Sequence, residues 1–165
     1  MVSTSGSRLM EPDALSLFQA TLLPLSTLLT PNIPEAELLA GRPIHGLEDM
    51  KAAARQILQM GPKAVLVKGG HGQGREKTDL LLIDGSFHTF SSATISTRNT
   101  HGTGCTLSSA IASFVARGQG ICEAVASAKA YLYEALRAGA DVSVGEGHGP
   151  VNHFYDPQPL ILTEQ

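Results

Sequence analysis

The chain has 165 residues, of which 42% are hydrophobic and 16% are charged, and its formal net charge is -3. This length and composition are typical of a single soluble globular domain with a hydrophobic core, and they exclude a fibrous protein. Because no dense group of Lys and Arg is present, neither a nucleic acid nor a membrane surface is expected as a partner, and a small-molecule ligand is expected instead.

The N-terminal half is predicted to alternate helices with buried strands. In chain order the elements are a helix that opens at Glu11-Pro12-Asp13 and ends at Pro24, a strand at 25–30, a helix at 35–40, a helix at about 47–60 and a strand at 64–67. In the first helix, Leu15, Phe18 and Leu22 form an apolar stripe. Pro24, Gly41 and Gly61 are typical of element ends.

The C-terminal half is predicted to contain a hairpin and two helices. Two strands are predicted at 80–83 and 87–90, and the turn signal Asp84-Gly85-Ser86 joins them as a hairpin. The antiparallel hairpin makes the predicted sheet mixed. Alanine-rich helices are expected at about 105–116 and 121–138. The alternation of strands and helices favours an α/β class in which 1–165 form one domain with a layered, mostly parallel sheet.

Three polar clusters follow the predicted strands or begin a helix. They are Thr30-Pro31-Asn32-Ile33-Pro34-Glu35, Lys68-Gly69-Gly70-His71 and Gly102-Thr103-Gly104-Cys105. In layered α/β sheets, ligands bind at the carboxyl ends of the parallel strands. We therefore expect all three clusters to lie on one rim of the sheet.

The segment Asn99-Thr100-His101-Gly102-Thr103-Gly104-Cys105-Thr106 places a small-residue turn and a cysteine at the start of a helical pattern. Apolar residues at 107, 110, 111, 114 and 115 share one helix face, and Gly118 ends it. The first N–H groups of a helix lack intrahelical acceptors and carry partial positive charge, so the turn is predicted to bind phosphate oxygens. A simple tight loop with a small, buried Cys105 is the alternative interpretation.

Cys105 has two candidate chemical roles. The positive end of a helix favours the thiolate, which would accept the proton of an attacking hydroxyl group. A nucleophilic cysteine that forms an acyl-enzyme is less favoured, because the sequence supplies no obvious base beyond the neighbouring His101. Cys105 and Cys122 lack the spacing of a zinc site and are interpreted as reduced thiols of a cytoplasmic protein.

Asn32, Glu35 and Lys68 carry the groups that phosphoryl transfer needs. Asn32 and Glu35 are placed to offer hard oxygen ligands to Mg²⁺ on nucleotide phosphates, and Lys68 is placed to neutralise a phosphate. With the helix start they indicate phosphoryl transfer, which depends on positioning and electrostatics. The alternatives are an Asn32 turn cap with a solvated Glu35, and an exposed Lys68. Lys129, taken alone, is interpreted as an exposed lysine.

The sequence shows no targeting or membrane segment, and four of its histidines are not interpreted as site residues. Residues 1–8 lack the apolar core of a signal peptide, and no apolar run is long enough to span a bilayer. The histidines interpreted as turn or surface residues are His45, His88, His148 and His153.

Four segments carry a resemblance to a known family: Thr30-Pro31-Asn32 with Glu35-Ala36-Glu37, Val67-Lys68-Gly69-Gly70-His71, the 99–106 segment, and Gly147-His148-Gly149-Pro150-Val151. They strongly resemble the hydroxymethylpyrimidine/phosphomethylpyrimidine kinases of thiamine biosynthesis, in the ribokinase-like superfamily. The similarity extends from Met1 to about Phe154 and implies a layered α/β/α fold. Ribokinases proper usually have an aspartate where this chain has Cys105.

The resemblance implies a role for each matching residue. Cys105 would be the catalytic base, and Gly102, Thr103 and Gly104 would form the anion hole. The residues implied in ATP and Mg²⁺ binding are Asn32, Glu35, Lys68, Thr100 and Lys129, with Asn32 and Glu35 at the metal. The implied reaction passes the γ-phosphate of ATP to the hydroxymethyl group of the aminopyrimidine, and a second phosphate to the resulting monophosphate.

The chain departs from the family in one respect: family members begin with a long N-terminal portion that this sequence does not resemble. The chain resembles the C-terminal, ATP-handling part, and Met1-Val2-Ser3-Thr4-Ser5-Gly6 resembles the end of an internal family strand. N-terminal strands of the sheet are therefore expected to be missing, which exposes an apolar face and an unpaired edge and favours homo-oligomers. Two alternative functions are a pyridoxal or pyridoxamine kinase, which shares the fold and often the cysteine, and a non-catalytic nucleotide-binding module.

Overall fold

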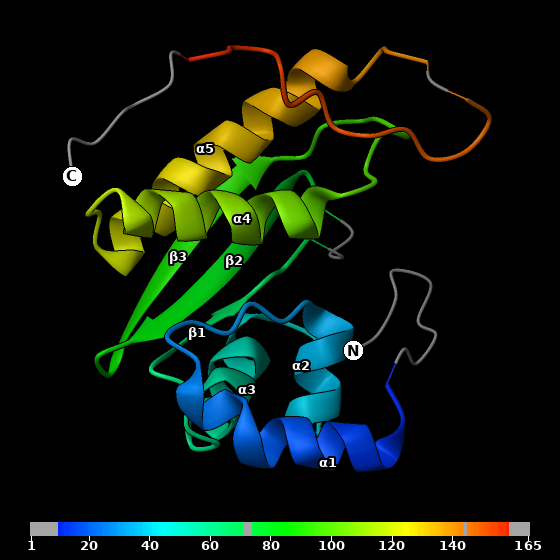
Figure 1. The fold of residues 1–165 in the computed structure, drawn as a ribbon. Helices are drawn as coiled ribbons and strands as arrows, with labels where there is room; N and C mark the ends of the chain where they lie inside the picture. Colours follow the sequence, from blue (N-terminus) through cyan, green and yellow to red (C-terminus); the bar gives the residue numbers. More distant parts are fainter. Residues whose placement is uncertain (1–9, 71–73, 144, 159–165) are drawn as a thin grey trace. The chain divides into compact units, whose positions relative to one another are not determined.

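The structure is a computed structural model in which residues 10–70, 74–143 and 145–158 are described. The elements in chain order are α1 (Pro12–Thr21), the 3-10 helix η1 (Leu23–Leu25), α2 (Ile33–Ala40), α3 (Leu47–Leu58), β1 (Ala64–Val67), β2 (Glu76–Ile83), β3 (Ser86–Ala93), α4 (Thr103–Ala116) and α5 (Ile121–Gly139) (Figure 1). They form two compact units, Met1–Thr94 and Ile95–Gln165. That 1–165 form one domain stays a prediction, and the segment 1–6 lies outside the described residues.

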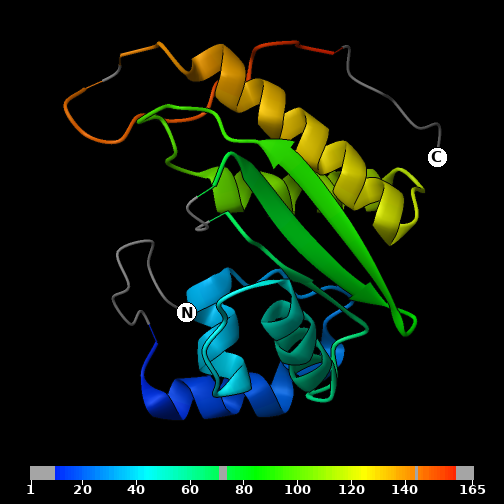
Figure 2. The ribbon, with the colours of Figure 1, turned by 180° about the vertical axis from the view of Figure 1, so that it is seen from behind.

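A three-stranded antiparallel sheet in the order β1-β2-β3 forms the centre of the first unit. Strands β2 and β3 are the predicted hairpin, and both turn residues, Asp84 and Gly85, have positive φ, at 48° and 73°. This geometry is that of a two-residue type I′ turn. The hairpin is longer than the apolar pattern predicted (Figure 2), because polar residues extend the ladder, with the hydroxyl groups of Thr78 and Ser91 2.8 Å apart.

Residues 26–32 run parallel to β1 and pair with it through backbone groups. The Leu66 N–H donates to the Leu29 carbonyl at 2.8 Å, and the Leu29 N–H donates to the Ala64 carbonyl at 3.0 Å. These parallel pairs are isolated bridges and do not form a named strand. Leu25, which was expected to begin a strand at 25–30, belongs to η1. The mostly parallel sheet is not confirmed, because the named strands of the described residues are antiparallel. The β1–β2 and β2–β3 connections are too short for a parallel crossover, which needs about a dozen residues or more.

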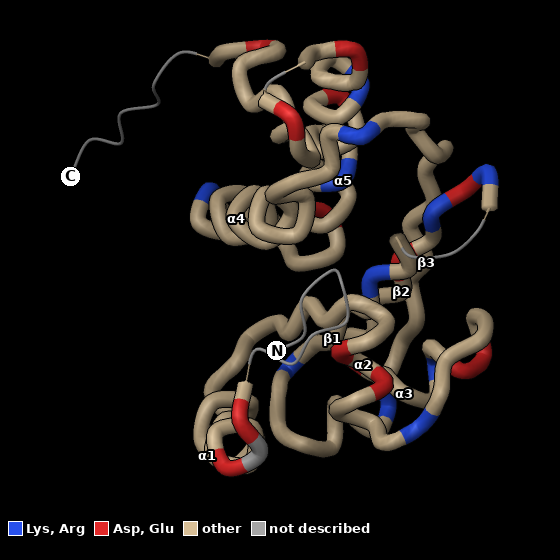
Figure 3. Tube along the Cα trace, turned by 90° about the vertical axis from the view of Figure 1, so that its right-hand side faces the viewer, with Lys and Arg blue, Asp and Glu red and all other residues tan. Residues whose placement is uncertain are grey.

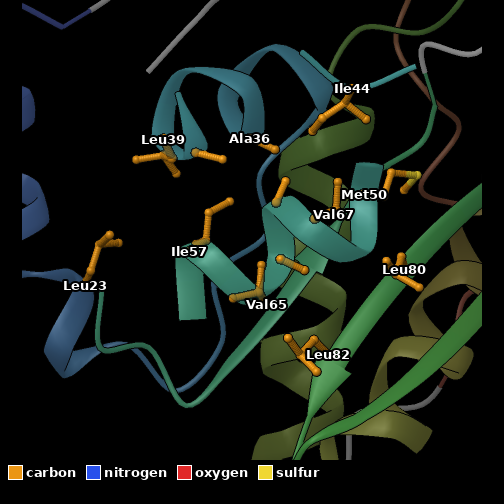
Figure 4. Close-up of a cluster of buried hydrophobic side chains, with 13 residues drawn as sticks. Leu23, Ala36, Leu39, Ile44, Met50, Ile57, Val65, Val67, Leu80 and Leu82 are labelled. Atoms are coloured by element: carbon orange, nitrogen blue, oxygen red, sulfur yellow. The ribbon is translucent and has the colours of Figure 1, made fainter. Parts of the chain in front are cut away.

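The core of the first unit lies between the sheet and helices α2 and α3 (Figure 4). Alternate side chains of β1 and β2 point into it, as the two-residue period of a strand requires. The buried cluster consists of Leu23, Ala36, Leu39, Ala40, Ile44, Met50, Ala53, Ala54, Ile57, Val65, Val67, Leu80 and Leu82. Each fully buried Leu, Ile or Val of this kind stabilises the fold by about 1.5–3 kcal/mol.

The helices of the first unit lie near their predicted positions, but α1 ends at Thr21 rather than at Pro24, and α2 begins at Ile33 rather than at Glu35. Leu15 and Phe18 of α1 pack against the core, whereas Leu22 lies beyond the helix end and is 53% exposed. Helix α2 ends at Gly41, whose φ of 64° is left-handed, and this is the conformation for which a glycine is favoured. Helix α3 begins at Leu47 as predicted and ends slightly earlier than expected.

The second unit is built on α4 and α5, which lie side by side in both ribbon views (Figures 1 and 2). A short turn joins them, and Gly118 in that turn has a φ of 92°. Both helices were predicted nearly to their ends. On the predicted apolar face of α4, Leu107 and Ile111 are buried, but Val115 is 38% exposed. Small buried alanines on α5, such as Ala124 and Ala128, allow close helix packing.

Charged residues are interspersed along both units. Lys and Arg segments alternate with Asp and Glu segments (Figure 3), and the i,i+3 pairs Lys51–Glu48 and Arg137–Glu134 lie at 2.7 and 2.6 Å. In the part of the chain that the structure describes, every helix is too short or too polar to cross a membrane.

Candidate functional site

Asn32 and Glu35 form a capping box at the start of α2. The Glu35 N–H donates to Asn32 Oδ1 at 2.8 Å, and the Asn32 N–H donates to Glu35 Oε2 at 2.9 Å. The interpretation of Asn32 as a cap is therefore confirmed. A carboxylate has several lone-pair sites on two oxygens, so capping does not exclude a metal role for Glu35.

Lys68 lies directly beside Asn32, as the clustering of strand ends predicted. The Lys68 N–H donates to the Pro31 carbonyl at 2.8 Å, and Asn32 and Lys68 form a parallel bridge. Lys68 is half-buried rather than fully exposed. His71, the last residue of this predicted cluster, lies outside the described residues. Two of the three predicted clusters thus meet at one edge of the first unit.

Asp79 on β2 belongs to this region, although no sequence motif indicated it. Its carboxyl group is buried, at 6% exposure of the residue, and Oδ1 accepts the Gly69 N–H at 2.8 Å. Gly69 also packs directly against the Thr78 carbonyl oxygen. An isolated Asp just before the strand predicted at 80–83 gives no signal of such a contact, because its partner Gly69 is ten residues away.

The described residues contain no group of three or more His, Cys, Asp or Glu side chains arranged to hold a metal ion. Magnesium rarely needs such a cage, because it is usually bound through one or two carboxylates together with substrate phosphates and water. Glu35 with Asn32 fits this second type of site and not the first. The oxygen donor set is the hard type that Mg²⁺ prefers.

In the second unit, the start of α4 has the predicted geometry. Gly102 is the N-cap residue, with a left-handed φ of 83°, and α4 begins at Thr103. The N–H and the hydroxyl group of Thr106 both donate to the Gly102 carbonyl at 2.8 Å, which fixes the first turn. The N–H groups of this turn point along the helix axis towards its N-terminus and favour an anion.

Cys105 is exposed in the first turn of α4, so the interpretation of a buried thiol is wrong. It opens onto a cleft of about 430 Å³. The cleft is lined by Cys105, Thr106, Ser109, Ala110, Ser113, Phe114, Arg117, Tyr131 and His153. An exposed thiol at a cleft is accessible to a ligand, and a proton acceptor requires such access.

Tyr131 of α5 and His153 of the C-terminal segment also line this cleft. The Tyr131 hydroxyl group donates to the His153 carbonyl at 3.3 Å, and the rings of Tyr131 and Tyr155 have centroids 5.6 Å apart. Partial burial, followed by the negative charge of Asp156, raises the pKa of Tyr155 above its usual 10.0. His153 is exposed, as predicted for a surface histidine, yet it borders the cleft.

The segment before α4 is held by Asn99, which is 7% exposed. Its Nδ2 donates to the Gly139 and Val142 carbonyls, both at 2.6 Å. The His101 N–H donates to the Gly149 carbonyl at 3.1 Å, so the 99–106 and 147–151 segments lie together. Sequence reasoning treated Asn99 only as part of a motif and missed its buried side chain.

The remaining predicted residues occupy varied positions. Thr100 is exposed, and its N–H donates to the Arg98 carbonyl at 3.0 Å. Lys129 is half-buried on α5, so the interpretation of a fully exposed lysine is wrong. His45 and His148 are exposed, as predicted, whereas His88 is half-buried on β3. Because Gly102–Cys105 and Lys129 belong to the second unit, the single rim for all three clusters stays a prediction.

Comparison with known proteins decides the family. A sequence model described as phosphomethylpyrimidine kinase matches residues 1–152. The chain belongs to the phosphomethylpyrimidine kinase family. Among the curated relatives, the hydroxymethylpyrimidine/phosphomethylpyrimidine kinase of Rhizobium meliloti is 48% identical over 156 residues, which are 94% of this chain and 59% of that protein. The thiamine biosynthesis bifunctional protein ThiED of Geobacter sulfurreducens is 46% identical over 93% of this chain and 31% of its own length.

Solved structures of phosphomethylpyrimidine and pyridoxal kinases resemble the chain in fold. The phosphomethylpyrimidine kinase of Clostridium difficile has a TM-score of 0.70 and 44% identity, covering 82% of this chain and 54% of that one. The Staphylococcus aureus pyridoxal kinase in complex with ADP has a TM-score of 0.84 and 32% identity, covering 93% of this chain and 55% of that one. The predicted ribokinase-like α/β class is confirmed. The chain spans 59% of the R. meliloti relative, and therefore only part of the length of the family's full kinases.

Proposed function

We propose that the chain forms the ATP-handling part of a kinase that phosphorylates 4-amino-5-hydroxymethyl-2-methylpyrimidine and then its monophosphate, in thiamine biosynthesis. The observation that carries the proposal is the left-handed Gly102 turn that begins α4 with Cys105 exposed in its first turn. The names of the R. meliloti and G. sulfurreducens relatives support the substrate and the pathway. Free thiols at both cysteines support a cytoplasmic location.

In the proposed reaction, the start of α4 and Cys105 perform different tasks. The N–H groups of Gly102, Thr103 and Gly104 stabilise negative charge on the transferred phosphoryl group. Cys105 as thiolate accepts the proton of the substrate hydroxyl group, whose oxygen forms a bond to the γ-phosphorus of ATP. The bond from that phosphorus to the β–γ bridging oxygen breaks, and ADP leaves with the electron pair.

The remaining site residues are proposed to hold the nucleotide. Lys68 offsets phosphate charge, Thr100 and Lys129 bind ATP, and Asn32 with Glu35 places oxygen atoms at the metal. When bound, Mg²⁺ would shield the charges of the β- and γ-phosphates and would keep most of its water ligands. The ADP and ATP-analogue complexes of the S. aureus pyridoxal kinase support ATP as the nucleotide.

The test measures binding and turnover separately. Calorimetry with MgATP shows whether the chain binds the nucleotide, and coupled detection of ADP shows whether it phosphorylates the aminopyrimidine alcohol, its monophosphate, pyridoxal or pyridoxamine. Preferential turnover of the pyrimidines supports the proposal. Preferential turnover of pyridoxal would contradict the proposal and establish the alternative kinase, which shares the fold. MgATP binding without any turnover would indicate a nucleotide-binding module.

We also propose that the chain forms homo-oligomers. Three leucines at α1 and η1 present apolar surface to solvent: Leu17 is 63%, Leu22 53% and Leu25 79% exposed. Exposed apolar clusters favour association. Light scattering of the wild type and of Leu25→Glu tests this proposal: a larger species in the wild type that the variant weakens supports it, and a monomeric wild type contradicts it.

A further inference from the structure

We infer that Asp79 is a positioning residue that holds the Lys68 loop, defined as residues 68–70, in place for phosphate binding. This inference rests on the proposed function, in which Lys68 binds a phosphate of ATP. The first observation is the buried carboxyl group of Asp79, whose Oδ1 accepts the Gly69 N–H at 2.8 Å. A hydrogen bond to a charged acceptor is stronger than one between neutral groups, and burial strengthens it further.

The second observation is the close approach of Gly69 to β2. A Cβ atom added at Gly69 would overlap the Thr78 carbonyl oxygen and would lie 3.0 Å from the Thr78 carbonyl carbon. Only a residue without a side chain allows the loop to lie this close to the strand. The loop is therefore held against β2 by a hydrogen bond and by a contact that any larger residue would break.

The third observation concerns the other side of the loop. The Lys68 N–H donates to the Pro31 carbonyl at 2.8 Å, and the bridge between Asn32 and Lys68 joins the loop to the start of α2. The backbone of Lys68 thus lies between two fixed neighbours, β2 through Gly69 and the capping box through Asn32. Asp79 sets the distance between these two parts, and so sets where the half-buried Lys68 side chain begins.

The inference predicts a defined pattern among variants of the full chain. Lys68→Ala should weaken MgATP binding about tenfold or more, which is the loss expected for about 1.4 kcal/mol. Asp79→Ala should weaken binding severalfold in the same direction, with the KM for ATP rising more than kcat falls. Asp79→Asn should remain within about twofold of the wild type, because its amide oxygen still accepts the Gly69 N–H.

A matched control separates positioning from general stability. Asp49 in α3 also accepts a backbone N–H, from His45 at 3.0 Å, but it lies outside the Lys68 loop. Asp49→Ala should lower thermal stability without changing MgATP affinity. Calorimetry and thermal unfolding are measured on all four variants. Wild-type affinity in a folded Asp79→Ala variant, alongside a weakened Lys68→Ala, overturns the inference but not the proposed function.

A measurement on the wild type covers the case in which Asp79→Ala does not fold. Hydrogen exchange resolved at single amides should show the Gly69 N–H protected in the nucleotide-free protein. Exchange of that amide at the rate of an unstructured peptide overturns the inference. Absence of MgATP binding in the wild type, with Gly69 protected, instead contradicts the proposed function.

Discussion

The side chain of Asn99 occupies the space in which a Cβ atom of residue 149 would lie, so Gly149 packs directly against the Asn99 amide. The same amide donates to the Gly139 carbonyl at the end of α5 and to the Val142 carbonyl in the segment that follows. One buried polar side chain thus joins the segment before α4, the end of α5 and the C-terminal segment. The left-handed turn at Gly102, which is proposed to bind phosphate, begins three residues after this junction.

Gly149→Ala should therefore destabilise the protein by about 1–3 kcal/mol, the usual cost of forcing extra volume into a packed site. Denaturant unfolding measures this change in the free energy of unfolding. Gly147→Ala is the matched control, because a Cβ at Gly147 has no atoms within 4 Å. Equal stabilities of the two variants would show that the Asn99 contact does not constrain residue 149.

Cys105→Ala should lower kcat by about 10²–10⁴-fold while leaving MgATP affinity nearly unchanged, as expected for loss of a general base. Full turnover in the variant would remove Cys105 from the mechanism. An independent measurement uses iodoacetamide and mass spectrometry. Because Cys105 is exposed and Cys122 is half-buried, Cys105 should be alkylated first, and Cys122→Ser serves as the control that leaves this rate unchanged.

The capping role and the proposed metal role at the start of α2 can be separated by two substitutions. Asn32→Ala should destabilise the protein by about 1 kcal/mol through loss of the N-cap. Glu35→Gln keeps an oxygen acceptor for the Asn32 N–H, so it should retain most of the stability and raise the Mg²⁺ concentration that ATP binding requires. Thermal unfolding and Mg²⁺ titrations in the presence of ATP measure the two effects. An unchanged Mg²⁺ requirement in Glu35→Gln would leave Glu35 with the capping role alone.

Tyr155 predicts a pH effect at alkaline pH. Since its pKa is raised in the folded state, chiefly by burial, the folded chain holds the phenolic proton more tightly than the unfolded chain does. The resulting stabilisation is fully present below the usual pKa of 10.0 and is lost as the pH rises through the higher folded value. Tyrosinate absorbance should show a group titrating above 10.0 that is absent in Tyr155→Phe and retained in Tyr133→Phe. Identical titrations of the wild type and Tyr155→Phe would contradict the raised pKa of Tyr155.

The elements predicted best have strong local signals. Asp84-Gly85 predicted the hairpin turn because both residues tolerate positive φ, and Gly41 predicted the end of α2. The start of α4 at the Gly102 turn followed from small residues before an apolar helical pattern. The 25–30 strand was less accurate, because an apolar run of this length is compatible with a 3-10 turn followed by a short bridging segment.

The sequence by itself determined the local elements and the family motifs, because helix caps, turn residues and apolar periods act between neighbours in the chain. Tertiary structure alone decided which motif residues contact one another. The Asp79–Gly69 and Asn99–Gly139 hydrogen bonds join residues 10 and 40 positions apart, and their short lengths depend on how the backbone packs around them. The same packing leaves the Cys105 thiol exposed at a cleft. Composition and residue spacing do not predict this exposure.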